Sequence, residues 1–127
     1  MRSYDVAVAS LAINAAIKWT DNLISQHTIP DVVSARRGVA RRISYRGLVR
    51  IALIRKLHTL LGTSVADGVR IAALLLDSDA HGVHESGHLT LIVDLEALER
   101  ELDQRLANAL ESAPALRRGR PPRRPRT

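Results

Sequence analysis

The sequence predicts a mainly α-helical domain with a small β-hairpin and one further short strand. Apolar residues recur at helical spacing in several stretches, and two other stretches are rich in β-branched residues. The chain has 127 residues with one tryptophan, two tyrosines and no phenylalanine. Its core must therefore consist mainly of Leu, Ile, Val and Ala, and its length fits one domain with a tail.

Two short helices are expected at the N-terminus. The first covers residues 5–12, and Asn14 is the expected N-cap of the second. Pro30 ends this region. Trp19 is interpreted as a core residue rather than a base-stacking one. The large apolar residues of the second helix are Ile17, Trp19, Leu23 and Ile24.

A basic hairpin is expected next. Residues 32–43, "VVSARRGVARRI", place β-branched residues on both sides of Gly38, and glycine supplies the positive φ that tight hairpin turns often need. The sequence therefore predicts a small two-stranded ribbon with arginines near its tip.

Two longer helices follow the hairpin. Ser44 is the expected N-cap of the first, which ends at Gly62, and Ser64 begins the second. Gly68 weakens the second helix by up to about 1 kcal/mol relative to Ala. The expected core residues are Leu48, Ile51, Ile54, Leu57, Leu60 and Leu61 in the first helix, and Val65, Val69, Ala72, Leu75 and Leu76 in the second.

The last third of the chain is predicted to form a loop, a strand and a helix. Residues 77–88 are polar and predict a loop, "LTLIV" at 89–93 predicts a strand, and Asp94 is the expected N-cap of a helix that Pro114 ends. The strand has two possible partners: its own copy across a two-fold axis, or the basic hairpin. We divide the chain into residues 1–76, residues 77–113 and a basic tail at 114–127.

Charge is separated into blocks along the chain. Residues 36–66 carry eight bases and no acid, residues 67–115 carry three bases and ten acids, and residues 116–127 carry six arginines and no acid. The net charge is +6. This distribution predicts a polyanion-binding region, an acidic region and a basic tail.

The order helix, helix, basic hairpin, helix, helix resembles the MerR-type DNA-binding domain, a winged helix-turn-helix, over roughly residues 5–76. Trp19 and Asp21 also fit the family pattern, whereas Thr20 replaces an aromatic residue and the usual Gly-Leu is absent. The residues that carry the resemblance are Gly38, Arg41, Arg42, Ser44, Leu48, Ile54, Leu57, Leu61, Gly62, Ser64 and Val65.

The resemblance implies that the second helix enters the major groove and that the hairpin lies beside the DNA backbone as a wing. Arginines at the tip of a stiff hairpin can reach phosphates or a narrow minor groove while the hairpin keeps its contacts with the core. Arg50, Arg55 and Lys56 either join this surface or form a solvated face. The candidate DNA contacts are Asn14, Lys18, Thr20, Asn22, Arg36, Arg37, Arg41, Arg42, Tyr45 and Arg46.

The tail contains Arg118, Gly119, Arg120 and Pro121, a sequence that resembles the AT-hook. The AT-hook lies in the minor groove of A·T-rich DNA, which distinguishes mainly A·T from G·C pairs. The alternatives are a nonspecific arm that raises affinity by releasing counterions, and an inert tail.

A leucine stripe on the last helix needs an apolar partner. The resemblance implies a homodimer through this helix, and the alternative is that the helix folds back on its own domain. The stripe consists of Leu95, Leu98, Leu102, Leu106 and Leu110.

Metal and cofactor sites are not expected. With no cysteine, disulfides and thiolate metal sites are excluded. His81, His84 and His88 lie in one loop with Asp79 and Glu85, and this is interpreted as a solvated loop rather than a zinc site.

The sequence predicts a dimeric, sequence-specific regulator of transcription that binds double-stranded DNA. No phosphate-binding loop, nucleophile elbow or spaced carboxylate pair is present, so we do not expect an enzyme. The alternatives are a nucleoid-associated protein that coats DNA, and an antitoxin-like or adaptor protein that binds a partner through its C-terminal helix. Neither a signal peptide nor a membrane span is apparent, so we expect a cytoplasmic protein.

Overall fold

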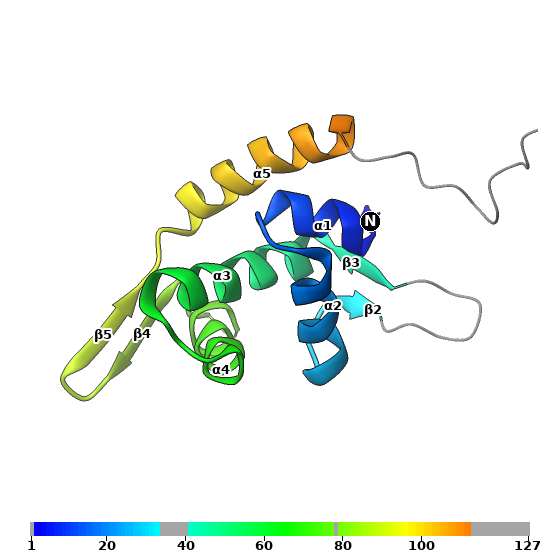
Figure 1. Cartoon of the computed structure of the whole chain (residues 1–127). Helices are drawn as coiled ribbons and strands as arrows, with labels where there is room; N and C mark the ends of the chain where they lie inside the picture. The colour runs from blue at the N-terminus through cyan, green and yellow to red at the C-terminus, as the bar shows by residue number, and fades with distance from the viewer. Residues whose placement is uncertain (1, 34–40, 78, 113–127) are drawn as a thin grey trace, which may run out of the picture.

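The computed structural model describes residues 2–33, 41–77 and 79–112. It is mainly helical with two small antiparallel sheets, which confirms the expected mainly α class (Figure 1). The elements in chain order are β1 (Ser3–Tyr4), α1 (Val6–Ala12), α2 (Ile17–Gln26), β2 (Val32–Val33), β3 (Arg42–Ser44), α3 (Tyr45–Leu61), α4 (Val65–Leu76), β4 (Val83–Ser86), β5 (Leu89–Ile92) and α5 (Leu95–Ser112).

The first sheet has the order β1-β3-β2. β2 and β3 are antiparallel with Val32 opposite Ile43, so the strands of the expected hairpin are present, while its tip at 34–40 lies outside the described residues. β1 was not expected; it pairs with the other edge of β3 and sets Tyr4 opposite Ile43. A two-residue strand carries too little alternation to be recognised in a sequence.

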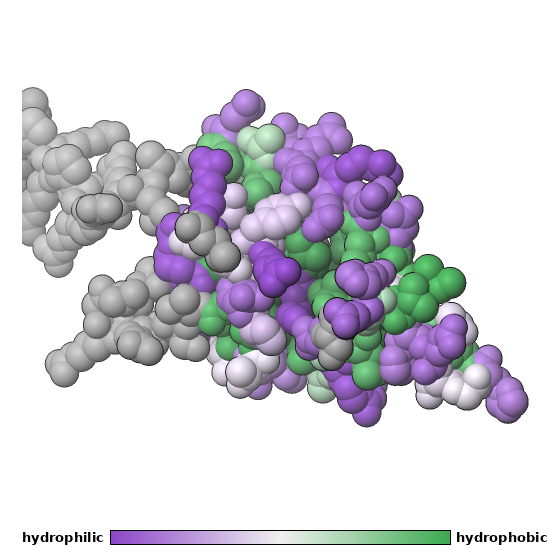
Figure 2. Space-filling model, turned by 180° about the vertical axis from the view of Figure 1, so that it is seen from behind, coloured by the Kyte–Doolittle hydropathy of each residue, from purple (hydrophilic) through white to green (hydrophobic). Residues whose placement is uncertain are grey.

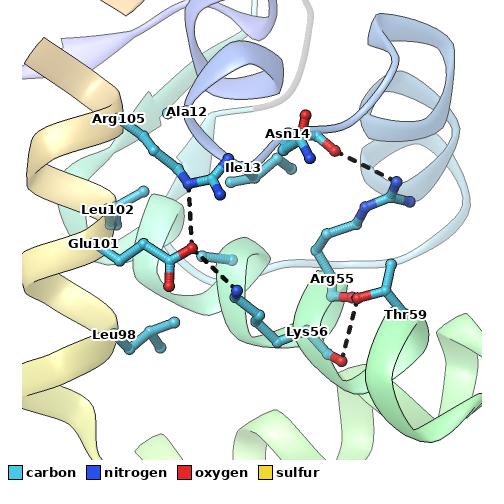
Figure 3. A pocket seen from close by; sticks show the side chains of 11 residues that line it. Ala12, Ile13, Asn14, Arg55, Lys56, Thr59, Leu98, Glu101, Leu102 and Arg105 are labelled. Atoms are coloured by element: carbon cyan, nitrogen blue, oxygen red, sulfur yellow. Dashed lines mark hydrogen bonds and ion pairs between the residues drawn. The ribbon is translucent and has the colours of Figure 1, made fainter. Parts of the chain in front are cut away.

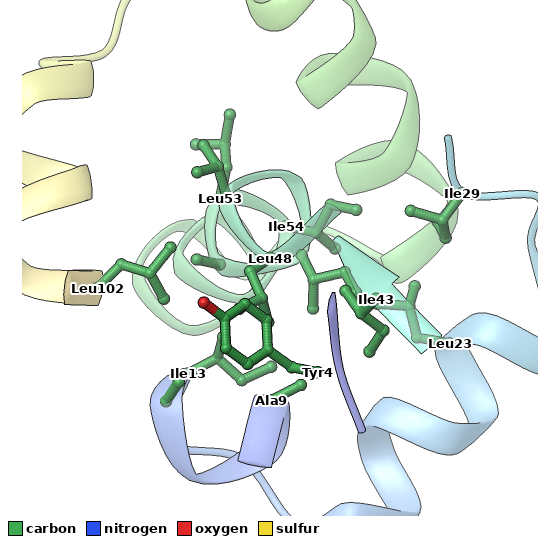
Figure 4. Close-up of a cluster of buried hydrophobic side chains, with 14 of the residues drawn as sticks. Tyr4, Ala9, Ile13, Leu23, Ile29, Ile43, Leu48, Leu53, Ile54 and Leu102 are labelled. Atoms are coloured by element: carbon green, nitrogen blue, oxygen red, sulfur yellow. The ribbon is translucent and has the colours of Figure 1, made fainter. Parts of the chain in front are cut away.

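The central element of the fold is α3, which is buried on nearly every side. Leu48, Ile51 and Ile54 are fully buried, and the first sheet, α4 and α5 all contact this helix (Figure 4). Two of its expected core residues are not core: Leu60 is 74% exposed and Leu61 is 68% exposed. They lie in the last turn, beyond the elements that cover the helix.

Most of the expected helix ends are confirmed. The Ser44 side chain accepts from the amide of Gly47 at 3.2 Å, and the Ser64 and Asp94 side chains cap α4 and α5 in the same way. Gly62 ends α3 with a φ of +69°. The expected N-cap at Asn14 is wrong: α2 starts after Ala16, because Asn14 has a positive φ of 55° in the turn before it.

The second sheet corrects the loop expected at 77–88. β4 lies within that stretch and pairs with β5, with Val83 opposite Ile92 and Ser86 opposite Leu89. β5 pairs with β4, which was not one of its two expected partners, and its other edge pairs with no strand among the described residues. β4 was missed because its residues "VHES" are mostly exposed, which leaves it without a clear apolar face.

α5 folds back across α1 and α3 (Figure 1). Leu102 and Leu106 are buried at 2% and 6% exposure, together with Ala109, in one core with residues of α1 and α3. Of the two arrangements considered for the leucine stripe, the intramolecular one is observed. Its centre is therefore occupied within one chain, and of the five leucines Leu110, at one end, is the exposed one, at 44%.

No helix in the described ranges combines the length and apolar character needed to cross a membrane.

Close packing at the start of α3 depends on Gly47. A Cβ at this position would lie 2.7 Å from the carbonyl oxygen of Asp31 and 3.1 Å from a methyl group of Ile43. The same carbonyl accepts a hydrogen bond from the amide of Ser44 at 3.1 Å. The start of α3 and the segment leading into β2 therefore touch backbone to backbone.

We expect Gly47→Ala to lower the free energy of unfolding by about 1–3 kcal/mol, because the added methyl meets backbone that cannot move independently. Urea denaturation measures this change. Gly68→Ala is the control: its Cβ would meet a side-chain methyl of Ile54 at 3.3 Å and no backbone atom closer than 3.7 Å, and Ala favours the helix, so its cost should be smaller. Equal stability of the Gly47→Ala and wild-type proteins would contradict the contact.

Candidate nucleic-acid interface

α1 and α2 are locked together by a buried pair of hydroxyl groups. The Ser10 hydroxyl donates to the Thr20 hydroxyl oxygen at 2.8 Å, and both residues are almost completely buried. Thr20 was expected to contact DNA; this is wrong, because its side chain is 0% exposed and holds α2 against α1.

The outer face of α2 is exposed and mostly polar, with Ile17 as an exposed apolar residue. Lys18 and Asn22 are one turn apart and both point to solvent, with Asp21 and Ser25 beside them. Asn14, also an expected contact, is exposed but lies in the turn before the helix. Three of the four candidates between residues 14 and 22 are therefore accessible to a ligand.

Arg41 joins the base of the hairpin to α2. Its guanidinium group pairs with the Asp21 carboxylate, donates to the Asp21 carbonyl oxygen at 3.1 Å and donates to the Ser25 hydroxyl oxygen at 2.8 Å. Arg41 was expected as a free contact on the wing, but three of its hydrogen bonds are made within the protein. Asp21 and Ser25 were not recognised in this role, since a contact across 16 to 20 residues has no local sequence signal.

Arg42 joins the hairpin to the N-terminus. Its guanidinium group donates to the Ser3 hydroxyl at 3.0 Å and to the Ser3 carbonyl at 2.7 Å, which holds β3 beside β1. The expected role as a free DNA contact is therefore also replaced by a structural one. Arg36 and Arg37, the other two arginines expected on the wing, lie outside the described residues.

Arg55 reinforces the start of α2 from the neighbouring helix. Its guanidinium carbon lies 4.8 Å from the centre of the Trp19 ring, and the group donates to the Asn14 carbonyl at 3.4 Å. Trp19 is partly buried against the core, as expected, and its outer side supports this cation. A positive charge is thus held beside the turn that leads into α2.

Other cations of the basic block pair with acids from distant parts of the chain. Arg50 was expected either on the DNA surface or on a solvated face, but it is buried and pairs with Asp77 at the end of α4. Lys56 pairs with Glu101 of α5 at 3.0 Å, and Arg105 approaches the same carboxylate at 3.1 Å. Folding therefore brings acids from elsewhere in the chain next to part of the basic block and neutralises that part locally.

The Glu101 pair lines a pocket of about 170 Å³ between the turn after α1, α3 and α5 (Figure 3). The hydrogen bond from Lys56, with further attraction from Arg105, lowers the pKa of Glu101 below its ordinary value despite partial burial. The charges in this pocket satisfy one another and fasten α5 to α3.

Tyr45 contacts α5 instead of serving as an available phosphate ligand. Its hydroxyl donates to the Asp103 carboxylate at 2.6 Å. Burial and this hydrogen bond raise the pKa of Tyr45 above its ordinary value, so the group remains a donor. Arg46, the next residue, is exposed and makes no hydrogen bond or ion pair with any residue that the structure describes.

Two groups of candidates remain, the histidine loop and the basic tail. Among the described residues no group of three His, Asp or Glu side chains is placed to hold a metal ion, and this includes His81, His84 and His88. The expected minor-groove motif at Arg118, Gly119, Arg120 and Pro121 lies outside the described residues.

Comparison with known proteins found no matching family model, no matching curated protein and no matching solved structure.

We expect Lys56→Met to cost about 0.5 kcal/mol of unfolding free energy at pH 7, because both partners of this pair are partly exposed and screened by solvent. Since the pKa of Glu101 is lowered in the folded protein, the pair stabilises above the ordinary glutamate pKa of about 4.3 and is lost as the pH falls through the lowered value. The difference between wild type and variant should therefore shrink below about pH 4. Urea denaturation at pH 7 and pH 3 measures it.

Arg100→Met is the control, because it also removes one positive charge, from an exposed residue of α5 that does not pair with Glu101. A wild-type advantage over Lys56→Met that stayed constant from pH 7 to pH 3 would exclude the ionised pair as its source.

Proposed function

We propose that this protein is a non-enzymatic regulator of transcription that binds double-stranded DNA, with α2 in the major groove and the β2–β3 hairpin beside it. One observation carries the proposal: an exposed polar face of α2 is held rigidly next to a basic hairpin. The Ser10–Thr20 bond fixes α2 to α1, and Arg41 fixes the hairpin to α2. Two recognition elements presented at a set spacing suit a regular duplex.

The charge of α2 supports the same function. Asp21 is the only acid of this helix, and the Arg41 guanidinium group neutralises it. The exposed face therefore offers Lys18 as a cation and Asn22 as an amide donor and acceptor, with no unpaired carboxylate to repel phosphate. Asparagine makes paired hydrogen bonds to adenine in the major groove.

The N-terminus of α2 is suited to a phosphate group. Ala16 provides no side-chain cap, so the first amide groups of the helix are available, and Lys18 is exposed in the first turn. Arg55 holds a second cation beside the preceding turn. The helix dipole and two cations together favour an anion at this end.

Arg36, Arg37 and the six arginines of the tail add further positive charge to the sequence. The sequence places the first two between β2 and β3 and the others after α5. In this proposal they raise affinity for the phosphate backbone, while α2 supplies the preference for particular bases.

The double variant Lys18→Ala/Asn22→Ala should lose specific duplex binding. Loss of one phosphate contact lowers the slope of log affinity against log salt by about 0.9, and loss of a base contact costs about 1–3 kcal/mol of discrimination. Fluorescence anisotropy with a selected duplex across a salt series measures both terms.

Arg100→Ala is the matched control, since it removes one exposed cation from α5, on the opposite side of the molecule from α2 (Figure 1). If Arg100→Ala weakened binding as much as the α2 variant, binding would depend on overall charge, and the role of α2 would be refuted.

Deleting residues 116–127 should lower affinity, reduce the salt dependence and leave the melting temperature unchanged, because this segment consists mainly of arginine and proline and has only one large apolar residue to bury. Footprinting on genomic DNA compares the sites that the shortened and full-length chains protect, and we expect the preferred site to be the same. One discrete protected site supports a regulator, and protection that spreads along A·T-rich DNA supports a coating protein instead.

A further inference from the structure

β5 presents an uncharged, apolar edge to solvent. Its four residues are Leu, Thr, Leu and Ile, and Leu89 and Ile92 are 65% and 73% exposed. Leu91 packs against the core and anchors the strand. Figure 2 shows hydrophobic side chains on the side of the molecule from which this hairpin projects.

The backbone of this edge is ready to pair. The amide of Val93 donates to the carbonyl of Gly82 at 2.8 Å, so residues 82 and 93 form a hydrogen-bonded pair of the ladder. Such pairs alternate along an antiparallel hairpin, which turns the amide and carbonyl groups of Thr90 and Ile92 away from β4. No other strand among the described residues pairs with them.

Exposed edges of this kind are usually protected by charge, proline or a covering element. β5 has no charged residue and no proline, whereas β4 on the other side of the hairpin carries Glu85 and His84. The two edges of one hairpin therefore differ: pairing two β4 strands would bring two carboxylates together, and pairing two β5 strands brings no like charges together.

We propose that β5 is a dimerisation edge, which pairs antiparallel with β5 of a second copy of this chain to form a four-stranded sheet. A second copy fits because two uncharged, apolar strands can pair without charge repulsion. A charged partner would find no opposite charge on β5 to pair with. The other symmetric candidate, the leucine stripe of α5, is already buried within one chain at Leu102 and Leu106. The inference rests on the hairpin alone and does not require that the protein bind DNA.

The hairpin also leaves the proposed DNA surface accessible. In Figure 1 it projects away from the β2–β3 hairpin, although its base lies near the start of α3, where Asp77 pairs with Arg50. Pairing through β5 would cover neither α2 nor the β2–β3 hairpin in either copy.

Sedimentation velocity of the full-length chain, freed of nucleic acid and measured over a concentration series, tests the inference. We expect wild type to reach twice the 14.0 kDa mass of one chain. Thr90→Pro removes an amide that faces the free edge, and Ile92→Lys adds charge to a residue that is already exposed, so both should stay at the mass of one chain.

Val83→Lys is the matched control. Val83 lies opposite Ile92 on the same face of the hairpin but belongs to β4, so its substitution should leave the doubled mass unchanged. Circular dichroism establishes that each variant retains its helical content. A monomeric wild type, a Thr90→Pro variant of doubled mass, or dissociation by Val83→Lys would each overturn the assignment.

The outcome is separate from that of the DNA experiments. A monomer that bound its duplex would refute only the β5 interface, and a dimer that ignored duplex DNA would refute only the proposed function.

Discussion

The structure depends on the burial of α3 on nearly all sides. A helix can be covered all round only if several other elements pack against it, and here the first sheet, α4 and α5 do so. Full burial of Leu48, Ile51 and Ile54 contributes several kcal/mol, at about 1.5–3 kcal/mol for each side chain. Gly47 lets the segment before β2 approach the start of this helix, so the hairpin takes its position from α3.

Opposite charges connect the elements that surround α3. Arg41, Arg50 and Lys56 come from a stretch without any acid, and each finds a carboxylate from a different region of the chain: α2, the end of α4 and α5. In the sequence the two signs are separated into blocks, and in the folded protein they meet. Charge that suggests polyanion binding in the sequence therefore serves in part to orient helices.

The return of α5 onto the N-terminal elements changes how the chain is expected to assemble. A leucine stripe has the same sequence pattern whether it faces its own domain or a second copy. Here the stripe faces its own domain, because α1 and α3 provide apolar neighbours for it. The helix is also held at its flanks by the contacts Tyr45–Asp103 and Lys56–Glu101. With that stripe occupied, the exposed β5 edge becomes the surface best suited to symmetric association.

The sequence by itself determined the helices, most of their ends and the two strands of the basic hairpin. These features depend on local chemistry: the spacing of apolar residues, the side-chain caps at Ser44, Ser64 and Asp94, and the left-handed conformation of Gly62. It also identified Lys18 and Asn22 as exposed polar residues of α2. Only the tertiary structure decided that Thr20 is buried, that Arg41 and Arg42 serve the protein's own framework, that β4 pairs with β5 and that α5 folds back. Each of these depends on which residues, distant in the chain, become neighbours, and a pattern of nearby residues carries no information about that choice.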